Sequence, residues 1–304
     1  MSFQQFLGEF ARVQGVGSAS ALLEDHADRY SFQIKSRERA RKFIETLETS
    51  ADFQPEGWNV LDVGCAYGSF AIELALRGAR VTGIDISQKW LSLAEVNAAG
   101  EVDDVTFLNC DASSRKALKE LSPHGPFDTV ILNDVFEHIY DTAGLLRNIT
   151  QLMTPDGIIY FKVPNGLATR HVLMEGHKKV FGISLLPPDY WHLYVKAPFH
   201  IYYRRWEYFA ALFDHFGLTQ THDMNPVTDQ GIDITRRHIR NDMKRIRTLL
   251  KRENFKDAAQ FAHVRRALAY YFEEVEEDLE TMSFEELFRK YRVTFWESIL
   301  KKRT

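Results

Sequence analysis

Residues 58–77 read WNVLDVGCAYGSFAIELALR, and this stretch decides the fold. A short apolar run is followed by small residues at Gly64, Ala66 and Gly68, after which the apolar pattern resumes. The pattern predicts a buried strand, a tight turn and a helix. Because small residues let another group come close to the backbone, we expect a ligand to lie at this turn.

The same alternation continues along the chain. Further apolar runs lie at 80–86, 104–110, 127–133 and 157–163, and amphipathic segments lie near 69–77, 88–98, 113–121 and 142–153. Strands that are apolar on both faces and alternate with helices are typical of a parallel sheet covered on both sides. The sequence therefore predicts a Rossmann-like, doubly wound α/β fold. A helix at 204–216, a sixth strand after Gly217 and an apolar segment at 292–300 would complete the sheet.

The pattern also predicts how the chain is divided. We expect a helical N-terminal segment at 1–50 and a core at 51–233 that carries an irregular insertion at 164–200. A helical insertion at 234–290 then forms a lid, and a final core strand lies at 291–304. Both insertions would leave from the carboxyl edge of the sheet, where open α/β sheets bind their ligands.

Composition excludes several classes of protein. The chain has 304 residues, 45% of them hydrophobic, a formal net charge of −4 and two cysteines. Two cysteines are too few for a disulfide framework or a cysteine zinc site. No apolar run reaches the roughly 20 residues of a membrane span, and no signal peptide is visible at the start, so we expect a cytoplasmic protein.

Acidic residues follow two neighbouring strands and narrow the choice of ligand. Asp85 comes about 20 residues after the glycine-rich turn, where a carboxylate can accept hydrogen bonds from a ribose. Asp111 follows the third strand. The turn lacks both the G-x-G-x-x-G of nicotinamide enzymes and the Gly-Lys-Ser/Thr ending of a phosphate loop.

Together these motifs resemble the class I S-adenosylmethionine-dependent methyltransferases. The resemblance covers about 58–223 and rests on VLDVGCAYG (60–68), GIDIS (83–87), CDA (110–112), FDTVILNDVFEHI (127–139) and LLRNITQLMTPDGIIYFKVPN (145–165). It implies a seven-stranded, mostly parallel sheet with an antiparallel last strand, S-adenosylmethionine as cofactor and methyl transfer as activity. Ala66 departs from the commonest form of the motif, which has a glycine there.

The resemblance also implies roles for the residues at the strand ends. The methionine part of the cofactor would be surrounded by Asp62, Gly64, Cys65, Ala66 and Gly68. Asp85 would hold the ribose, Ile86, Asp111 and Ala112 would meet the adenine, and Asn133 would lie beside the sulfonium. Two structural alternatives stay open: Asp62 can cap its own turn, and Asp85 can cap the helix at 88–98.

Catalytic residues are expected beyond the fourth strand. A hydroxyl acceptor must lose its proton, and His138 and His200 are the candidate bases. Asp134, Glu137, His138 and His200 also form a hypothetical site for a divalent metal, because similar small-RNA and quinone-pathway enzymes use one. Alternatively, Glu137 and His138 only organise the turn.

Aromatic residues and charged stretches indicate what the methyl acceptor and the partners of the protein are. Aromatic and histidine side chains at 190–203 can contact a sugar or another small molecule, and His192 and His200 are the preferred candidates. We expect O-methylation of a small-molecule or glycan hydroxyl; an N-methyltransferase or an inactive cofactor-binding subunit are the alternatives. The basic stretch 234–252 and the acidic stretch 271–280 are expected to pair within the chain or across a homodimer, and nucleic acid is not expected as a partner.

Overall fold

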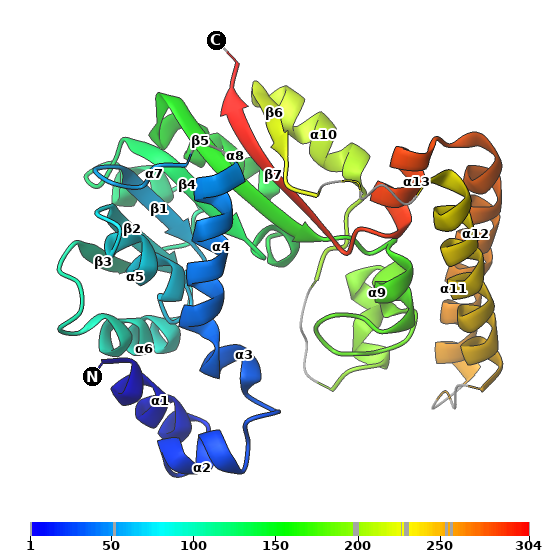
Figure 1. Cartoon of the computed structure of the whole chain (residues 1–304), viewed down its shortest axis with the longest axis horizontal. Helices are drawn as coiled ribbons and strands as arrows, with labels where there is room; N and C mark the ends of the chain where they lie inside the picture. The colour runs from blue at the N-terminus through cyan, green and yellow to red at the C-terminus, as the bar shows by residue number, and fades with distance from the viewer. Residues whose placement is uncertain are drawn as a thin grey trace.

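The computed structural model describes residues 2–50, 53–196, 201–225, 227, 231–252, 255 and 258–303. A seven-stranded sheet runs through the centre in the order β3-β2-β1-β4-β5-β7-β6 (Figure 1). β7 is antiparallel to both of its neighbours, whereas β1 to β5 pair in parallel. The predicted fold is confirmed. The strands are β1 (Asn59–Val63), β2 (Arg80–Asp85), β3 (Val105–Asn109), β4 (Phe127–Asn133), β5 (Met153–Pro164), β6 (Leu218–Asp223) and β7 (Phe295–Lys302).

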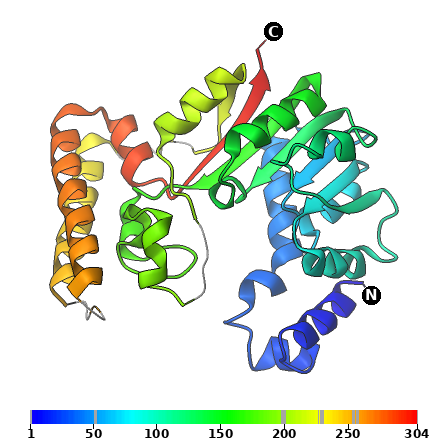
Figure 2. The same cartoon turned by 180° about the vertical axis from the view of Figure 1, so that it is seen from behind.

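Helices cover both faces of the sheet, which explains why its central strands β1 and β4 are almost entirely buried and mostly apolar. On one face α4 (Ser36–Ser50) and α5 (Ser69–Ala75) pack Ile44 and Leu74 against Val60. On the other face, seen in Figure 2, lie α7 (Ala117–Leu121), α8 (Thr142–Leu152) and α10 (Trp206–His215). α6 (Gln88–Ala98) follows β2 and contacts β3.

Several element boundaries differ from the sequence prediction, among them that of β7, which covers Phe295–Lys302 rather than 292–300. Two of the differences have a local cause. α7 begins at Ala117 rather than 113, because the side chain of Asp111 accepts hydrogen bonds from the amide and hydroxyl of Ser113 and forms a turn there. β5 begins at Met153 rather than 157, because Met153 pairs with Phe127 across a register shift. Polar residues at the start of β5 hide this extension from a search for apolar runs.

The N-terminal helices lie over the turn that follows β1. They are α1 (Ser2–Val13), α2 (Ala19–Glu24) and α3 (Ser31–Ile34), and α1 packs against α6. The rings of Phe6 and Tyr67 lie 5.3 Å apart, so α1 directly contacts the glycine-rich turn. This packing closes one side of the carboxyl edge of the sheet.

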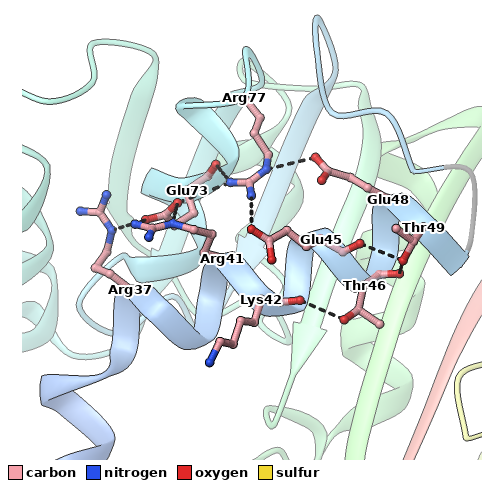
Figure 3. Close-up of polar contacts among 9 residues, drawn as sticks. All are labelled: Arg37, Arg41, Lys42, Glu45, Thr46, Glu48, Thr49, Glu73 and Arg77. Carbon is pink, nitrogen blue, oxygen red and sulfur yellow. Dashed lines mark hydrogen bonds and ion pairs between the residues drawn. The ribbon is translucent and has the colours of Figure 1, made fainter.

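A buried ion-pair network fixes α4 to the core (Figure 3). Glu73 of α5 is only 2% exposed and accepts from Arg37 at 2.9 Å, from Arg41 at 3.3 Å and from Arg77 at 3.4 Å. Arg77 also pairs with Glu48 of α4 at 3.0 Å. Because burying an unpaired carboxylate costs free energy, the three arginines stabilise Glu73 in its buried position and hold α4 against α5.

The segments after β5 and β6 build a second apolar core at the other end of the molecule. After β5 come α9 (Thr169–Leu173) and the 3₁₀ helices η2 (Ile183–Leu185) and η3 (Pro188–Leu193); between β6 and β7 come α11 (Ile232–Arg252), α12 (Ala258–Thr281) and α13 (Phe284–Tyr291). Trp191, Ile239 and Val264 are buried together there. In Figure 1, α11 and α12 stand side by side at the edge farthest from the N-terminal helices.

The basic and acidic stretches of these helices pair with each other. Arg240 of α11 lies 3.5 Å from Glu280 of α12, and Arg247 forms an ion pair with Glu276. The described helices include none long and apolar enough to cross a membrane.

Candidate active site

The turn after β1 has the conformation that its small residues predict. Gly64 and Gly68 have φ angles of +70° and +72°, and Ala66 has a φ of +48°. A Cβ on Gly64 would lie 2.8 Å from Val135, and one on Gly68 would lie 2.7 Å from Phe107. Side chains of this protein therefore already lie as close to the turn as we expected a ligand to lie. Glycine is needed at both positions even before any ligand binds.

Asp85 holds this turn in place. One of its carboxylate oxygens accepts from the Ala66 amide at 3.0 Å and the other accepts from the Ser87 amide at 2.8 Å. Asp85 does not cap α6, whose N-cap residue is Ser87 and has no side-chain cap bond. Its carboxylate instead links Ser87 to the glycine-rich turn. Ile86 follows it with 76% of its surface exposed, an unusual state for a large apolar side chain at a strand end.

Asp62 lies beneath the turn and is buried. Its Oδ2 atom has no hydrogen-bond partner among the described residues. Burial, together with the nearby Asp85 carboxylate, raises the pKa of Asp62 to about 7, although the Ala71 amide at the start of α5 acts in the opposite direction. The structural alternative for Asp62 therefore has a contact that supports it, namely the bond to α5.

The remaining expected cofactor residues lie at the ends of β1 and β3. Asp111 is exposed and accepts from Ser113, while Ala112 is buried and its carbonyl accepts from Asn148 at 2.8 Å. Cys65 is buried, and burial raises the pKa of its thiol well above the ordinary value. It is therefore a packed side chain rather than a reactive one.

The end of β4 presents polar atoms that lack partners within the described part of the chain. The Oδ1 atoms of Asn133 and Asp134 are buried without hydrogen bonds. Asp134 has a φ of +56°, and its Oδ2 lies 3.9 Å from the ammonium of Lys162. Buried polar atoms without partners are rare in proteins, so this strand end has unused capacity to bind something polar.

Glu137 is the most unusual of these residues. It is fully buried, and neither carboxylate oxygen has a hydrogen-bond partner in the described ranges. Burial and the nearby Asp134 carboxylate raise its pKa well above the ordinary value. Its Oε1 lies 3.8 Å from Nε2 of His138 and 3.9 Å from Nε2 of His177.

Glu137, His138 and His177 form a group that can hold a metal ion, with one ligand atom from each residue and all three atoms within 4.8 Å of one another. Sequence analysis missed His177, which lies in the irregular segment after α9; the only signal was the Glu-Gly-His sequence at 175–177. Asp134 does not belong to the group. His200, expected as a base and a ligand, lies outside the described residues.

Glu175 contacts the group through His177. His177 Nδ1 lies 2.8 Å from Glu175 Oε1, and the Tyr203 hydroxyl and the Lys178 amide donate to the same carboxylate. Burial alone would raise the pKa of Glu175, but these hydrogen bonds outweigh it and lower the pKa to about 2.

Arg39 is a second residue that sequence analysis missed. It lies on α4, where its side chain hydrogen-bonds with Tyr67 of the glycine-rich turn and is attracted by Asp134. A guanidinium at this edge fits a carboxylate ligand. Its position on an N-terminal helix, 25 residues before Gly64, gave no motif to find it by.

Most of the described aromatic residues at 190–203 pack within the protein, which agrees with the expectation that only one or two of them contact an acceptor. The Tyr194 hydroxyl donates to the Gln260 carbonyl, Trp191 is buried, and the Tyr190 ring lies 4.4 Å from His263. His192 is exposed, and its Nδ1 contacts the Asp189 carbonyl at 2.6 Å. Tyr202 is nearest to the site, because its amide donates to the Glu137 carbonyl.

Comparison with known proteins agrees with this geometry. The family profile described as a methyltransferase domain matches residues 32–223, more than half of the chain. The chain belongs to this methyltransferase family. The resemblance to class I S-adenosylmethionine-dependent methyltransferases is thereby confirmed, together with S-adenosylmethionine as the cofactor.

Similar proteins cover the core of this methyltransferase. A ubiquinone biosynthesis O-methyltransferase of Paracidovorax citrulli is 37% identical over 131 residues, which make up 42% of this chain and 53% of that protein. One from Neisseria meningitidis is 34% identical over 123 residues, 40% of this chain and 50% of that protein. The methyltransferase thus matches about half the length of these curated relatives.

Among solved structures, an S-adenosylmethionine-dependent methyltransferase from Mesorhizobium loti has a similar fold. The TM-score is 0.51 at 17% identity, and the match covers 88% of this chain and all of that one. This likeness supports the fold described above.

Proposed function

We propose that this methyltransferase transfers the methyl group of S-adenosylmethionine to a hydroxyl of a small molecule. The observation that carries the proposal is Glu137, a buried carboxylate that faces two histidines at the end of β4 and has no hydrogen-bond partner among the residues that the structure describes. β4 pairs with β1, so this group lies next to the glycine-rich turn. Basic groups beside the methyl donor are needed for a hydroxyl acceptor, whereas a neutral amine needs none.

In the proposed reaction, the acceptor oxygen attacks the methyl carbon while the carbon–sulfur bond breaks, and S-adenosylhomocysteine leaves. The hydroxyl proton passes to a histidine, for which His138 and His177 are the candidates among the described residues. Asp85 and Ile86 would bind the nucleoside, with Asp111 and Ala112 at the adenine. The turn residues Asp62, Gly64, Cys65, Ala66 and Gly68 would surround the methionine part, Arg39 would bind its carboxylate, and Asn133 would lie beside the sulfonium.

A divalent metal fits the same group. The two unpaired oxygens of Glu137, with His138 and His177, offer the oxygen and nitrogen donors that Mg²⁺, Mn²⁺ or Zn²⁺ accept. A bound cation would lower the pKa of a hydroxyl that it contacts. Glu137 would be the main ligand, because binding a cation would compensate the cost of burying a carboxylate that has no hydrogen bond among the described residues.

The relatives favour a hydroxyl acceptor, since they are named for O-methylation in ubiquinone biosynthesis. We therefore place a hydroxylated aromatic ring first and a sugar second. Within one chain, Arg240 and Arg247 of α11 already pair with glutamates of α12.

The test is methyl transfer with catechol, sugar and primary amine acceptors, followed by mass spectrometry of the products. We expect O-methylated catechol, and we expect turnover to fall at least tenfold after chelation if the metal takes part. Asp85→Ala should abolish uptake of S-adenosylhomocysteine in calorimetry. Methylation of the amine alone would favour the N-methyltransferase alternative, and tight uptake of cofactor without turnover of any acceptor would favour an inactive cofactor-binding subunit.

A further inference from the structure

Glu175 is fully buried, yet its carboxylate accepts hydrogen bonds from three donors, two in its own loop and one, Tyr203, from a later segment. Its Oε1 meets His177 Nδ1 at 2.8 Å and the Tyr203 hydroxyl at 2.5 Å, and its Oε2 accepts from the Lys178 amide at 2.5 Å. This is the opposite of Glu137, which is equally buried and has no such donors in the described part of the chain. The two carboxylates lie on opposite sides of one imidazole ring.

The ring of His177 therefore has one nitrogen toward each glutamate. Nδ1 faces Glu175 at 2.8 Å, whereas Nε2 lies 3.9 Å from Glu137 Oε1. A carboxylate can only accept, so the contact with Glu175 requires a proton on Nδ1. In the neutral ring this leaves Nε2 as the nitrogen that carries the lone pair.

We propose that Glu175 is a positioning residue: it holds His177 in the Nδ1–H tautomer and directs Nε2 toward Glu137 and the acceptor. The inference rests on the proposed function only for the part that His177 plays in turnover. Carboxylates behind catalytic or metal-binding histidines fix the tautomer and orientation of the ring, and their loss commonly costs 10- to 100-fold in activity or metal affinity.

The surroundings of Glu175 make one substitution especially informative. In Glu175→Gln, the side-chain oxygen must face the Lys178 amide, because a backbone N–H can only donate. The side-chain NH₂ group then faces His177 Nδ1 and donates to it. The variant keeps the shape of the site and reverses the hydrogen bond, so His177 should change to the Nε2–H tautomer.

Tyr203→Phe is the matched control. It removes a donor to the same Glu175 oxygen but leaves a carboxylate facing His177. A residue that only stabilises the loop would respond similarly to both substitutions. A positioning residue responds to Glu175→Gln alone in the tautomer readout.

The experiment is ¹⁵N NMR of the full chain with labelled histidine, using His177→Ala to assign the signal. We expect Nδ1–H in the native protein and in Tyr203→Phe, and Nε2–H in Glu175→Gln. We also expect kcat to fall 10- to 100-fold in Glu175→Gln at unchanged affinity for S-adenosylhomocysteine, and less than threefold in Tyr203→Phe.

An Nε2–H tautomer in the native protein overturns the inference, even if Glu175→Gln does not fold. So does a tautomer that is the same in Glu175→Gln as in the native protein. The NMR readout needs no acceptor, so it decides the inference even when none of the tested acceptors is methylated. In that case only the proposed function fails.

Discussion

The turns after β1 and β4 are neighbours, because the two strands pair, and each holds a non-glycine residue at positive φ: Ala66 and Asp134. They differ in how their polar groups are satisfied. At the β1 turn, both oxygens of Asp85 accept backbone hydrogen bonds. At the β4 turn, Asp134 has a buried oxygen without a partner among the described residues, and both oxygens of Glu137 lack one.

The difference indicates two ways of preparing a site. The β1 turn is ordered by the chain itself, so it can receive a cofactor without rearrangement. The β4 turn keeps buried polar atoms whose desolvation costs free energy until something binds to them. Such groups persist where function requires them, and the cost in stability is then compensated elsewhere in the fold.

The largest expected effect comes from replacing the unsatisfied carboxylate. Glu137→Met should lower methyl transfer at least 100-fold while raising the free energy of unfolding by about 1 kcal/mol, because it removes buried polar atoms without partners. The measurements are kcat and urea unfolding at pH 8. Affinity for S-adenosylhomocysteine should stay within about threefold, since the cofactor turn is independent of this side chain.

Glu73→Met is the control for the stability half of this prediction. Glu73 is also a buried glutamate, but it is paired with Arg37, Arg41 and Arg77 (Figure 3). Its loss removes the carboxylate that these three arginines share, although Arg37 keeps Glu101 and Arg77 keeps Glu48 as partners. Because several charge-assisted contacts are lost, the protein should be destabilised by about 2 kcal/mol. If both variants lose stability equally, the distinction between satisfied and unsatisfied carboxylates is wrong.

Much of the β1 side could be predicted from sequence because its signals are local. Small residues at 64–68 and an acid at the end of the next strand follow from chain order, and the strand alternation alone gives the sheet. The antiparallel β7 was expected from its large apolar residues and the family resemblance, although the helices α11 to α13 separate it from β6.

The β4 side was harder because its partners come from distant segments. His177 and Glu175 lie in a stretch with little regular structure, so no periodicity marks them. Arg39 lies on an amphipathic helix where a charged side chain looks like ordinary solvent-facing polarity. What the glycines contact, Val135 and Phe107, depends on packing between strands and is not encoded in the turn itself.

Asp62 offers a smaller test, because it is a carboxylate at the β1 turn with one buried oxygen that has no partner in the described part of the chain. Its pKa is raised to about 7 from 3.8, so the folded state keeps a proton that the unfolded state releases. Stability should therefore fall as the pH rises through this interval, by about 2 kcal/mol between pH 5 and 7, and Asp62→Asn should lack this loss. Urea unfolding of both proteins at pH 5, 7 and 8 measures it; a difference between them that is independent of pH contradicts the assignment.

The smallest effects are expected from glycine substitutions that compare the two turns directly. Ala66→Gly removes the backbone strain of a non-glycine residue at positive φ, but it also makes the unfolded chain more flexible. The free energy of unfolding should therefore rise by at most about 0.5 kcal/mol, with cofactor affinity unchanged. Asp134→Gly removes the same strain and also a buried oxygen that has no partner among the described residues. Its free energy of unfolding should therefore rise more, by about 1 kcal/mol, while methyl transfer should be lost. Thermal unfolding and kcat of the two variants decide the matter. Equal gains in stability would mean that backbone strain alone accounts for the effect of both substitutions. A larger gain for Asp134→Gly would show that the Asp134 carboxylate is kept at a cost to stability.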